Sequence, residues 1–228
     1  LTMDIEQIRL AFTPIADSYA MNWKLVDSNK KPKMALLASH ESHCLMDLLH
    51  RWHSNELHCD IPCIIANHPQ MKQFADWYNI PFHWIDFKVL GKDAAFAQIS
   101  QLIKQYDIDL TVLARFMQIL PDALCRELTG RAINIHHSFL PSFAGAKPYQ
   151  QAYDRGVKLI GATCHYVTGD LDEGPIIEQE VMRISHSDTA QDMVRKGKNC
   201  EKTALANGVR YHLEDRVIIH HSKTVVFA

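Results

Sequence analysis

Two polar side chains, Asn134 and His136, lie two residues apart at the end of the apolar run "AINIH". Residues i and i+2 of a strand point to the same side of a sheet, so a strand here would project the amide and the imidazole together. A later apolar run leads into "CHYVTGDLDEGP", which holds His165 and Asp172. An amide, an imidazole and a carboxylate that meet at one site are suited to attack on a carbonyl carbon. Asn134 would donate to the oxygen that becomes negative, and His136 would donate and pass a proton. Asp172 would hold His136 charged and draw a proton from the attacking water.

Other interpretations of the same residues are open at this point. Asn134 and His136 could be a hydrogen-bonded pair that only ties down a loop, because buried polar groups need partners in any case. The carboxylates of the later segment could belong to a solvated turn. A metallohydrolase could instead use His136, His137, His165 and Asp172, although the fourteen histidines of the chain make chance clusters common.

The segments that must position these groups alternate between two kinds of pattern. Short apolar runs such as "MALLAS", "IPCIIAN" and "LTVLARF" are typical of strands covered on both faces, and stretches with helical spacing separate them. This order predicts an α/β fold with a mostly parallel twisted sheet and helices on both faces. In such sheets a site forms beyond the carboxyl ends of the strands, which is where Asn134 and His136 would lie. We expect a closing hairpin in "RVIIHHSKTVVF".

The turn after the first strand of this sheet lacks the glycines of a nucleotide site. It reads Ser39-His40-Glu41-Ser42-His43, and the first glycine of the chain is Gly91. Glycines let the backbone approach a phosphate, and Glu41 would repel one at the following helix start. The sequence therefore argues against NAD, FAD and ATP, and against a phosphorylated substrate in this place. We expect His40 and His43 to be solvated imidazoles at a polar helix cap.

Composition narrows the class of protein further. The net charge of −2 over 228 residues gives no reason to expect a nucleic-acid or membrane-surface partner. No apolar run reaches the ~18 residues of a membrane span, and no signal segment opens the sequence, so we expect a cytoplasmic protein. Six scattered cysteines are expected to be reduced thiols in the core.

The two polar segments together resemble a known family. "NIHHSFLPSFAG" and "HYVTGDLDEGP" are similar to motifs of the formyltransferase-like family of formyltetrahydrofolate-utilising enzymes, and the resemblance covers about Lys33 to the C-terminus. It implies that water attacks the formyl carbon of 10-formyltetrahydrofolate, giving formate for purine biosynthesis and balancing one-carbon pools. The family's catalytic residues match Asn134, His136 and Asp172, with His165 in support. Because the folate is the substrate, we expect no cofactor and no metal.

The resemblance also implies a folate pocket. Two segments would line it, with the pteridine against apolar walls and backbone groups: Met117, Gln118, Ile119, Leu120, Val167, Thr168, Gly169 and Asp170. Arg115 stands where the family's transformylases often carry glycine, so the pocket mouth should differ. The alternatives that stay open are a phosphoribosylglycinamide formyltransferase, the metal-dependent hydrolase described above, and a folate-binding module without catalysis.

The N-terminal segment differs from the rest. "LTMDIE" and "NWKLVD" alternate like strands and flank a helical stretch, and the polar "SNKKPK" follows. We interpret residues 1–28 as the C-terminal remnant of an ACT-type regulatory domain, 29–33 as a linker and 34–228 as the catalytic domain. The sequence opens on Leu1, which suggests that residues have been lost before it. ACT-type domains commonly bind amino acids and assemble in pairs, so an amino-acid effector and a homo-oligomer are expected.

Overall fold

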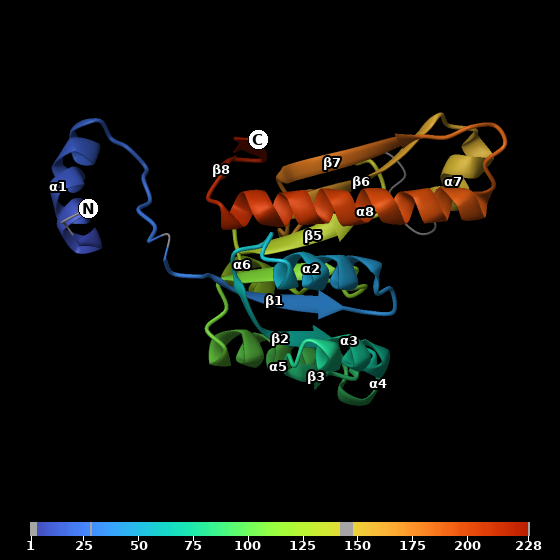
Figure 1. Cartoon of the computed structure of the whole chain (residues 1–228), viewed down its shortest axis with the longest axis horizontal. Coiled ribbons are helices and arrows are strands. Elements are labelled where there is room, and N and C mark those ends of the chain that lie inside the picture. Colours follow the sequence, from blue (N-terminus) through green and yellow to red (C-terminus); the bar gives the residue numbers. More distant parts are fainter. Residues whose placement is uncertain (1–3, 28, 142–147, 228) are drawn as a thin grey trace. The chain divides into compact units, whose positions relative to one another are not determined.

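The computed structural model describes residues 4–27, 29–141 and 148–227. Two compact units divide the chain, Leu1–Lys31 and Pro32–Ala228. The larger unit alternates strands and helices along the sequence, as predicted (Figure 1). Its strands are β1 (Lys33–Ala38), β2 (Asp60–Ala66), β3 (Phe82–Trp84), β4 (Leu110–Ala114), β5 (Ala132–His136), β6 (Leu159–Tyr166), β7 (Ile176–Arg183), β8 (Val217–His220) and β9 (Lys223–Val226). Its helices are α2 (His43–His53), η1 (Pro69–Met71), α3 (Lys72–Trp77), α4 (Phe87–Leu90), α5 (Lys92–Gln105), α6 (Asp122–Glu127), α7 (Pro148–Arg155) and α8 (Ala190–Leu213).

The main sheet of the described residues has seven strands in the order β3-β2-β1-β4-β5-β6-β7. The first five of these are parallel, whereas β6 runs antiparallel to β5 and β7 antiparallel to β6. The change of direction pairs Asn134 of β5 directly with His165 of β6. Two of the polar residues singled out from the sequence are therefore cross-strand neighbours. The closing hairpin forms from β8 and β9 as expected.

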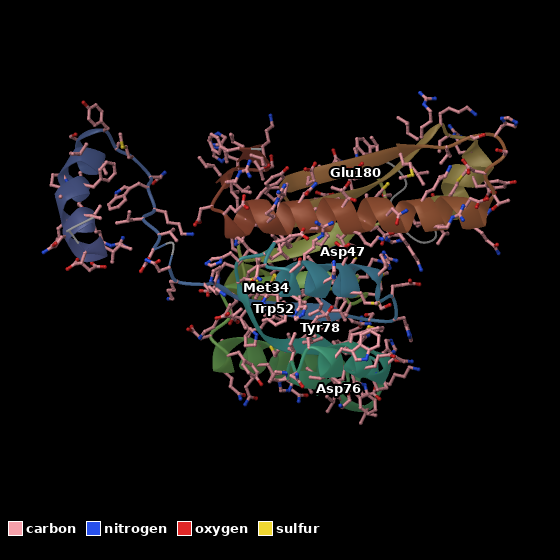
Figure 2. All side chains as sticks on the ribbon, viewed as in Figure 1. Met34, Asp47, Trp52, Asp76, Tyr78 and Glu180 are labelled. Carbon is pink, nitrogen blue, oxygen red and sulfur yellow. The ribbon has the colours of Figure 1, made fainter. Side chains whose placement is uncertain are left out.

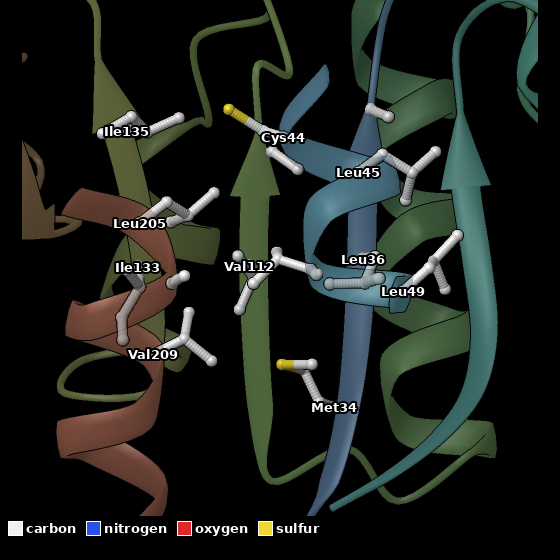
Figure 3. Packing of buried hydrophobic residues seen from close by; sticks show 14 of the residues in the cluster. Met34, Leu36, Cys44, Leu45, Leu49, Val112, Ile133, Ile135, Leu205 and Val209 are labelled. Carbon is white, nitrogen blue, oxygen red and sulfur yellow. The ribbon is translucent and has the colours of Figure 1, made fainter. Parts of the chain in front are cut away.

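Apolar packing covers both faces of this sheet. On one face Leu36, Val112 and Ile133 pack against α2 and α8, as Figure 3 shows. On the other face Leu37 and Leu113 pack against α5 and α6. The continuous apolar runs of the sequence follow from this arrangement, because each central strand is buried on both sides. Trp52 and Tyr78 pack at the margin of the core that includes α2 and α8. Their rings lie 6.3 Å apart, and both residues are labelled in Figure 2.

The longest helix, α8, carries a charge within its buried stripe. Thr189 caps it, since its side chain accepts from the backbone N–H of Asp192. A Cβ on Gly208 would stand 2.4 Å from Sγ of Cys164, so only glycine lets the helix approach β6 this closely. The buried side also includes Glu201, whose partners are described below.

Several expectations for single segments were wrong. Asp4 caps α1 (Ile5–Ser18), so Ile5 and Glu6 are helical rather than extended; Leu1 to Met3 lie outside the described residues. Residues 22–27 form no strand, because no described segment of the smaller unit pairs with them. The helix between them was predicted correctly. In the larger unit α7 was not expected, and the strand over "FHWIDF" stops early, since Asp86 caps α4 by accepting from the N–H of Lys88.

Two compositional expectations can be compared with the structure. The six cysteines are all free and buried, which confirms the expectation of reduced core thiols. In the described ranges, no helix combines the length and the apolar character that a membrane span needs.

Candidate active site

The candidate site forms at the carboxyl end of β5. Asn134 and His136 project from the strand on the side opposite Ile133 and Ile135, which pack in the core shared with α8. Asp172 reaches the same place from the loop after β6, and its Oδ2 lies 3.1 Å from Nδ1 of His136. The structure thus brings together the three side chains that the sequence singled out.

The loop that carries Asp172 is held tightly against the end of β6. The N–H of Tyr166 donates to the carbonyl of Pro175 at 2.9 Å. A Cβ on Gly174 would stand 1.8 Å from the carbonyl oxygen of Tyr166, so this position admits only glycine. Asp172 itself has a φ of +58°, a left-handed conformation that a residue with a side chain adopts at a cost of ~1–2 kcal/mol. Such strain persists where surrounding contacts fix it, often at functional sites.

His165 connects Asn134 to the backbone. Its Nδ1 lies 2.9 Å from the carbonyl oxygen of Tyr166 and its Nε2 lies 3.2 Å from Nδ2 of Asn134. A carbonyl oxygen only accepts, so Nδ1 carries the hydrogen, and in the neutral ring Nε2 accepts from the amide. One amide N–H of Asn134 is therefore used to fix its orientation, and the second is left to face the cavity. In this geometry His165 holds the Asn134 amide in place.

Asp172 is electrostatically bound to the two histidines. The hydrogen bond from His136, and then the neighbouring His165 ring, hold the pKa of the Asp172 carboxyl well below its usual value of 3.8, although burial opposes them. Its other oxygen, Oδ1, lies 3.7 Å from Nε2 of His165, and the side chain is 23% exposed. A carboxylate that is permanently charged and still open to solvent can hold a water molecule.

His136 presents an unused nitrogen. Its Nε2 is buried and has no hydrogen-bond partner among the described residues, whereas Nδ1 faces Asp172. A buried polar atom without a partner costs ~1–3 kcal/mol, so a ligand group that supplies the partner is strongly favoured. His136 lines the same cavity as Asn134. When both ring nitrogens of His136 carry a hydrogen, the two side chains offer a bound carbonyl oxygen two donors.

A cavity of about 600 Å³ opens in front of these groups. Ser39, at the end of β1, shapes its wall, because the backbone N–H of Met117 donates to the buried Oγ of Ser39 at 2.9 Å. Met117 and Ile119 are large apolar side chains exposed at the cavity, where they offer an apolar surface to a ligand. The eight residues predicted to bind the folate all line this cavity: Met117, Gln118, Ile119, Leu120, Val167, Thr168, Gly169 and Asp170.

The turn after β1 differs from its expected form. His43 is not solvated, because its Nε2 lies 2.7 Å from Oε2 of the buried Glu201. Glu41 pairs with Lys198 of α8 at 2.5 Å, and this bond lowers the pKa of the Glu41 carboxyl. His40 remains exposed and stacks on another ring. The interpretation of His43 was wrong because the sequence does not show that α8 returns to this turn.

Sequence reasoning also missed the residues around Glu201. Arg115 pairs with it at 3.2 Å, and the hydroxyl of Tyr149 donates to its Oε1 at 2.6 Å. One signal was present in the sequence. A glutamate within the apolar spacing of α8 must be paired if it is buried, so "CEKTAL" could have indicated a buried ion pair.

Within the described residues, one group of metal-ligating side chains has its donor atoms within 4.8 Å of one another: His43, Cys44 and Glu201. It includes none of the four residues of the metallohydrolase alternative. The group does not suit a cation, since the guanidinium of Arg115 already pairs with the carboxylate. Burial, and then the charge of Glu201, also raise the pKa of the Cys44 thiol well above its usual value, which keeps it protonated.

Comparison with known proteins gives the class. Residues 32–209 match the formyl transferase family, so fold and site define a member of that class. A curated relative from Synechocystis sp., a formyltetrahydrofolate deformylase, is 48% identical over 218 residues, covering 96% of this chain and 76% of the relative. The crystal structure of a formyltetrahydrofolate deformylase from Pseudomonas syringae pv. tomato is 56% identical with a TM-score of 0.97, covering 100% of this chain and 76% of that one. The chain belongs to the formyltetrahydrofolate deformylase family.

The transferases of the same class share the fold. The phosphoribosylglycinamide formyltransferase from Anaplasma phagocytophilum is 31% identical with a TM-score of 0.80, covering 87% of this chain and 96% of that one. The mostly parallel sheet is thus common to proteins named for hydrolysis and for transfer. The reaction must be argued from the side chains around the reacting carbon.

Proposed function

We propose that this protein hydrolyses 10-formyltetrahydrofolate to formate and tetrahydrofolate. The observation that carries the proposal is the unpartnered, buried Nε2 of His136 beside the Asn134 amide, with Asp172 on the other side of the same ring. The pteridine would occupy the 600 Å³ cavity between the segments 117–120 and 167–170. Its formyl oxygen would then accept hydrogen bonds from Asn134 and His136.

The chemistry follows from these positions. Asp172 holds a water molecule, whose oxygen bonds to the formyl carbon and forms a tetrahedral oxyanion. Asn134 and the charged His136 stabilise that oxyanion as it develops, which is the interaction that lowers the barrier. The bond from carbon to the folate nitrogen then breaks as that nitrogen gains a proton. The water has supplied one oxygen and one hydrogen to formic acid, which ionises to formate, and the other hydrogen to the nitrogen of tetrahydrofolate.

The low pKa of Asp172 fits a proton acceptor whose basicity changes during the reaction. In the resting site its carboxylate is a weak base, because the hydrogen bond from His136 and the neighbouring His165 ring stabilise the charged form. When the tetrahedral intermediate breaks down and His136 passes its proton to the folate nitrogen, the positive charge of the imidazole disappears. The Asp172 carboxyl then loses the partner that lowered its pKa, and it holds more firmly the proton that it took from the attacking water.

Hydrolysis is favoured over formyl transfer by the turn after β1. A transferase needs a site for an amine that carries a ribose phosphate, and this turn holds Glu41 paired to Lys198 instead of glycines. The deciding experiment is incubation of the protein with 10-formyltetrahydrofolate in the absence of any amine, with formate and tetrahydrofolate measured together. We expect both products in equal amounts. No formate without an amine, but transfer when one is added, would contradict hydrolysis.

A metal-dependent mechanism is tested in the same assay. We expect full activity after prolonged chelation, and no stoichiometric metal by elemental analysis. Loss of activity that added zinc or another divalent ion restores would favour the metallohydrolase. Tight folate binding without turnover would favour the binding module.

The regulatory part of the proposal rests on resemblance alone. We propose that residues 1–28 belong to an ACT-type domain, that an amino acid acts as effector through it, and that the protein is a cytoplasmic homo-oligomer. The helix α1 agrees with that domain, whereas the absence of a strand over residues 22–27 does not. Light scattering of the purified protein would test the assembly, and a scan of amino acids in the formate assay would test the effector.

A further inference from the structure

A buried carboxylate adjoins the candidate active site without belonging to it. Glu201 is 1% exposed and has three partners from three other segments. Nε2 of His43 lies 2.7 Å from its Oε2, the Tyr149 hydroxyl 2.6 Å from its Oε1, and Nε of Arg115 3.2 Å from its Oε2. Burial raises the pKa of this carboxyl, but the hydrogen bond from His43 and the charge of Arg115 outweigh it, and the pKa is lowered. We call these four residues the Glu201 cluster.

The chain adopts unfavourable local structure to build this cluster. Arg115 has a φ of +63°, a left-handed conformation that glycine adopts more easily. Strand alternation would turn its side chain to the same face as Leu113, toward α5 and α6. It instead contacts Glu201 of α8, on the other face. A Cβ on Gly197 would stand 2.1 Å from the Tyr149 ring, so a glycine within α8 is needed to admit that ring.

One member of the cluster, Arg115, reaches the reaction cavity. Arg115 and His137 line the same cavity as Asn134, His136 and Asp172. The ring of His137 lies 5.2 Å from that of His136 and 6.3 Å, centre to centre, from that of Tyr149. Burial, and then the charge of Arg115, lower the pKa of His137 to about 4, which keeps this ring neutral at the wall.

The same cluster joins the start of α2 to α8. His43 at the start of α2 and Glu201 of α8 are paired, and Glu41 and Lys198 form a second bridge between the same segments. Arg115 lines the cavity and also pairs with Glu201 of the first bridge. Its side chain therefore lies between the cavity and the two bridges. Paired charges therefore lie between the Arg115 side of the cavity and the turn after β1.

We propose that the Glu201 cluster determines the nucleophile: it excludes amines from the formyl carbon and leaves water as the acceptor. The inference rests on the proposed hydrolysis of 10-formyltetrahydrofolate. An amine that attacked would form a bond from its nitrogen to the formyl carbon and lose a proton. The folate nitrogen would gain a proton, and its bond to the formyl carbon would break to release tetrahydrofolate. Such an acceptor must bring its substituents to the carbon on a side that folate does not fill. The Arg115 guanidinium occupies that side and repels the protonated form of an amine, whereas water requires no further space.

The test replaces Arg115 and offers a small amine. Arg115→Gly removes the guanidinium and relieves the left-handed backbone, and Arg115→Gly/Glu201→Gln also avoids leaving a buried carboxylate with fewer partners. Each protein is incubated with 10-formyltetrahydrofolate and increasing glycinamide. Formate and N-formylglycinamide are measured in the same samples by liquid chromatography and mass spectrometry.

We expect wild type to give formate alone at every glycinamide concentration. At least one of the two variants should divide its product, with the formylated amine rising with glycinamide to at least tenfold above wild type. Arg115→Lys is the matched control: it keeps a long cationic side chain at the same backbone position, and its product should remain formate.

Several outcomes would overturn the proposal. Folded variants that release formate but form no more N-formylglycinamide than buffer would show that the cluster does not select the nucleophile. Wild type that already formylates glycinamide would overturn it without any variant, and so would both variants failing to fold, since the cluster would then be needed for the fold itself. Failure of the proposed function is distinct from these, because it is a lack of formate from wild type when no amine is present.

Discussion

Asp172→Asn is the substitution that tests the candidate mechanism most directly. The amide has nearly the same shape as the carboxylate, so it can still lie 3.1 Å from Nδ1 of His136 and accept its hydrogen. What it lacks is the negative charge and the ability to take a proton. The interaction lost is a strong one, because His136 and His165 together hold the pKa of Asp172 well below 3.8.

The magnitude follows from the two roles that the carboxylate combines. General acid–base groups contribute about 10²–10⁴ in rate, and one donor to an oxyanion contributes about 10²–10³. Asp172→Asn removes the base and also weakens His136 as a charged donor. Effects of residues that act as a unit do not simply multiply, so we expect kcat to fall by about 10³–10⁵. KM should change much less, because Asp172 lies beside the reacting carbon.

The assay is acceptor-free release of formate from 10-formyltetrahydrofolate, with kcat and KM determined for both proteins. Glu173→Gln is the matched control: it removes one carboxylate from the next residue, which is exposed and does not line the cavity. Its kcat should stay within about twofold of wild type, as expected for a surface substitution. If Asp172→Asn retains turnover within tenfold of wild type while folded, the assignment of Asp172 is wrong.

Three further predictions concern neighbouring groups. Asn134→Ala and His136→Ala should each lower kcat by at least ~10²–10³ with a folded protein, because each removes a donor to the oxyanion. Formate release checks this, and a variant that raises KM while kcat stays unchanged would contradict it. Ser39→Ala should raise KM several-fold and lower the free energy of unfolding by about 1 kcal/mol, because the N–H of Met117 loses its partner; urea titration and the formate assay together test it. The pKa of His137 is lowered from 6.5 to about 4 in the folded protein, so the unfolded chain binds the extra proton between these values and stability falls as pH falls through them. Between pH 7.5 and 5 the free energy of unfolding should therefore fall by up to about 2 kcal/mol less in His137→Gln than in wild type. Urea titrations at both pH values measure this, and an equal fall in the two proteins would refute it.

The sequence was informative wherever local pattern and tertiary structure agree. Apolar runs such as that of β4 are buried on both faces, so their strands could be predicted within a residue or two. Asn134 and His136 could be placed on one side of β5 from strand alternation alone. Asp172 could be assigned to the same site because it also follows a strand of the predicted sheet, but no local pattern shows that the loop after β6 returns to β5, and the resemblance supported that step.

The errors have a common physical origin. The segment "NWKLVD" alternates as a strand does, yet a strand forms only where another pairs with it. His43 is a solvated cap by local pattern and a buried partner of Glu201 in the structure, because α8 comes back to the turn after β1 from more than a hundred residues away. Long-range ion pairs of this kind leave almost no trace in sequence spacing.

The antiparallel pairing of β5 with β6 has a consequence for how the chain can change in length. Asn134 faces His165 only because the two strands hold one register, and inserting or deleting a single residue within β6 would turn His165 to the opposite face of the sheet. The amide would then lose the imidazole that orients it, even if the fold survived. Length variation compatible with activity must therefore fall in the connections, and the spacing from Leu159 to Tyr166 is as much a part of the reactive centre as the side chains it carries.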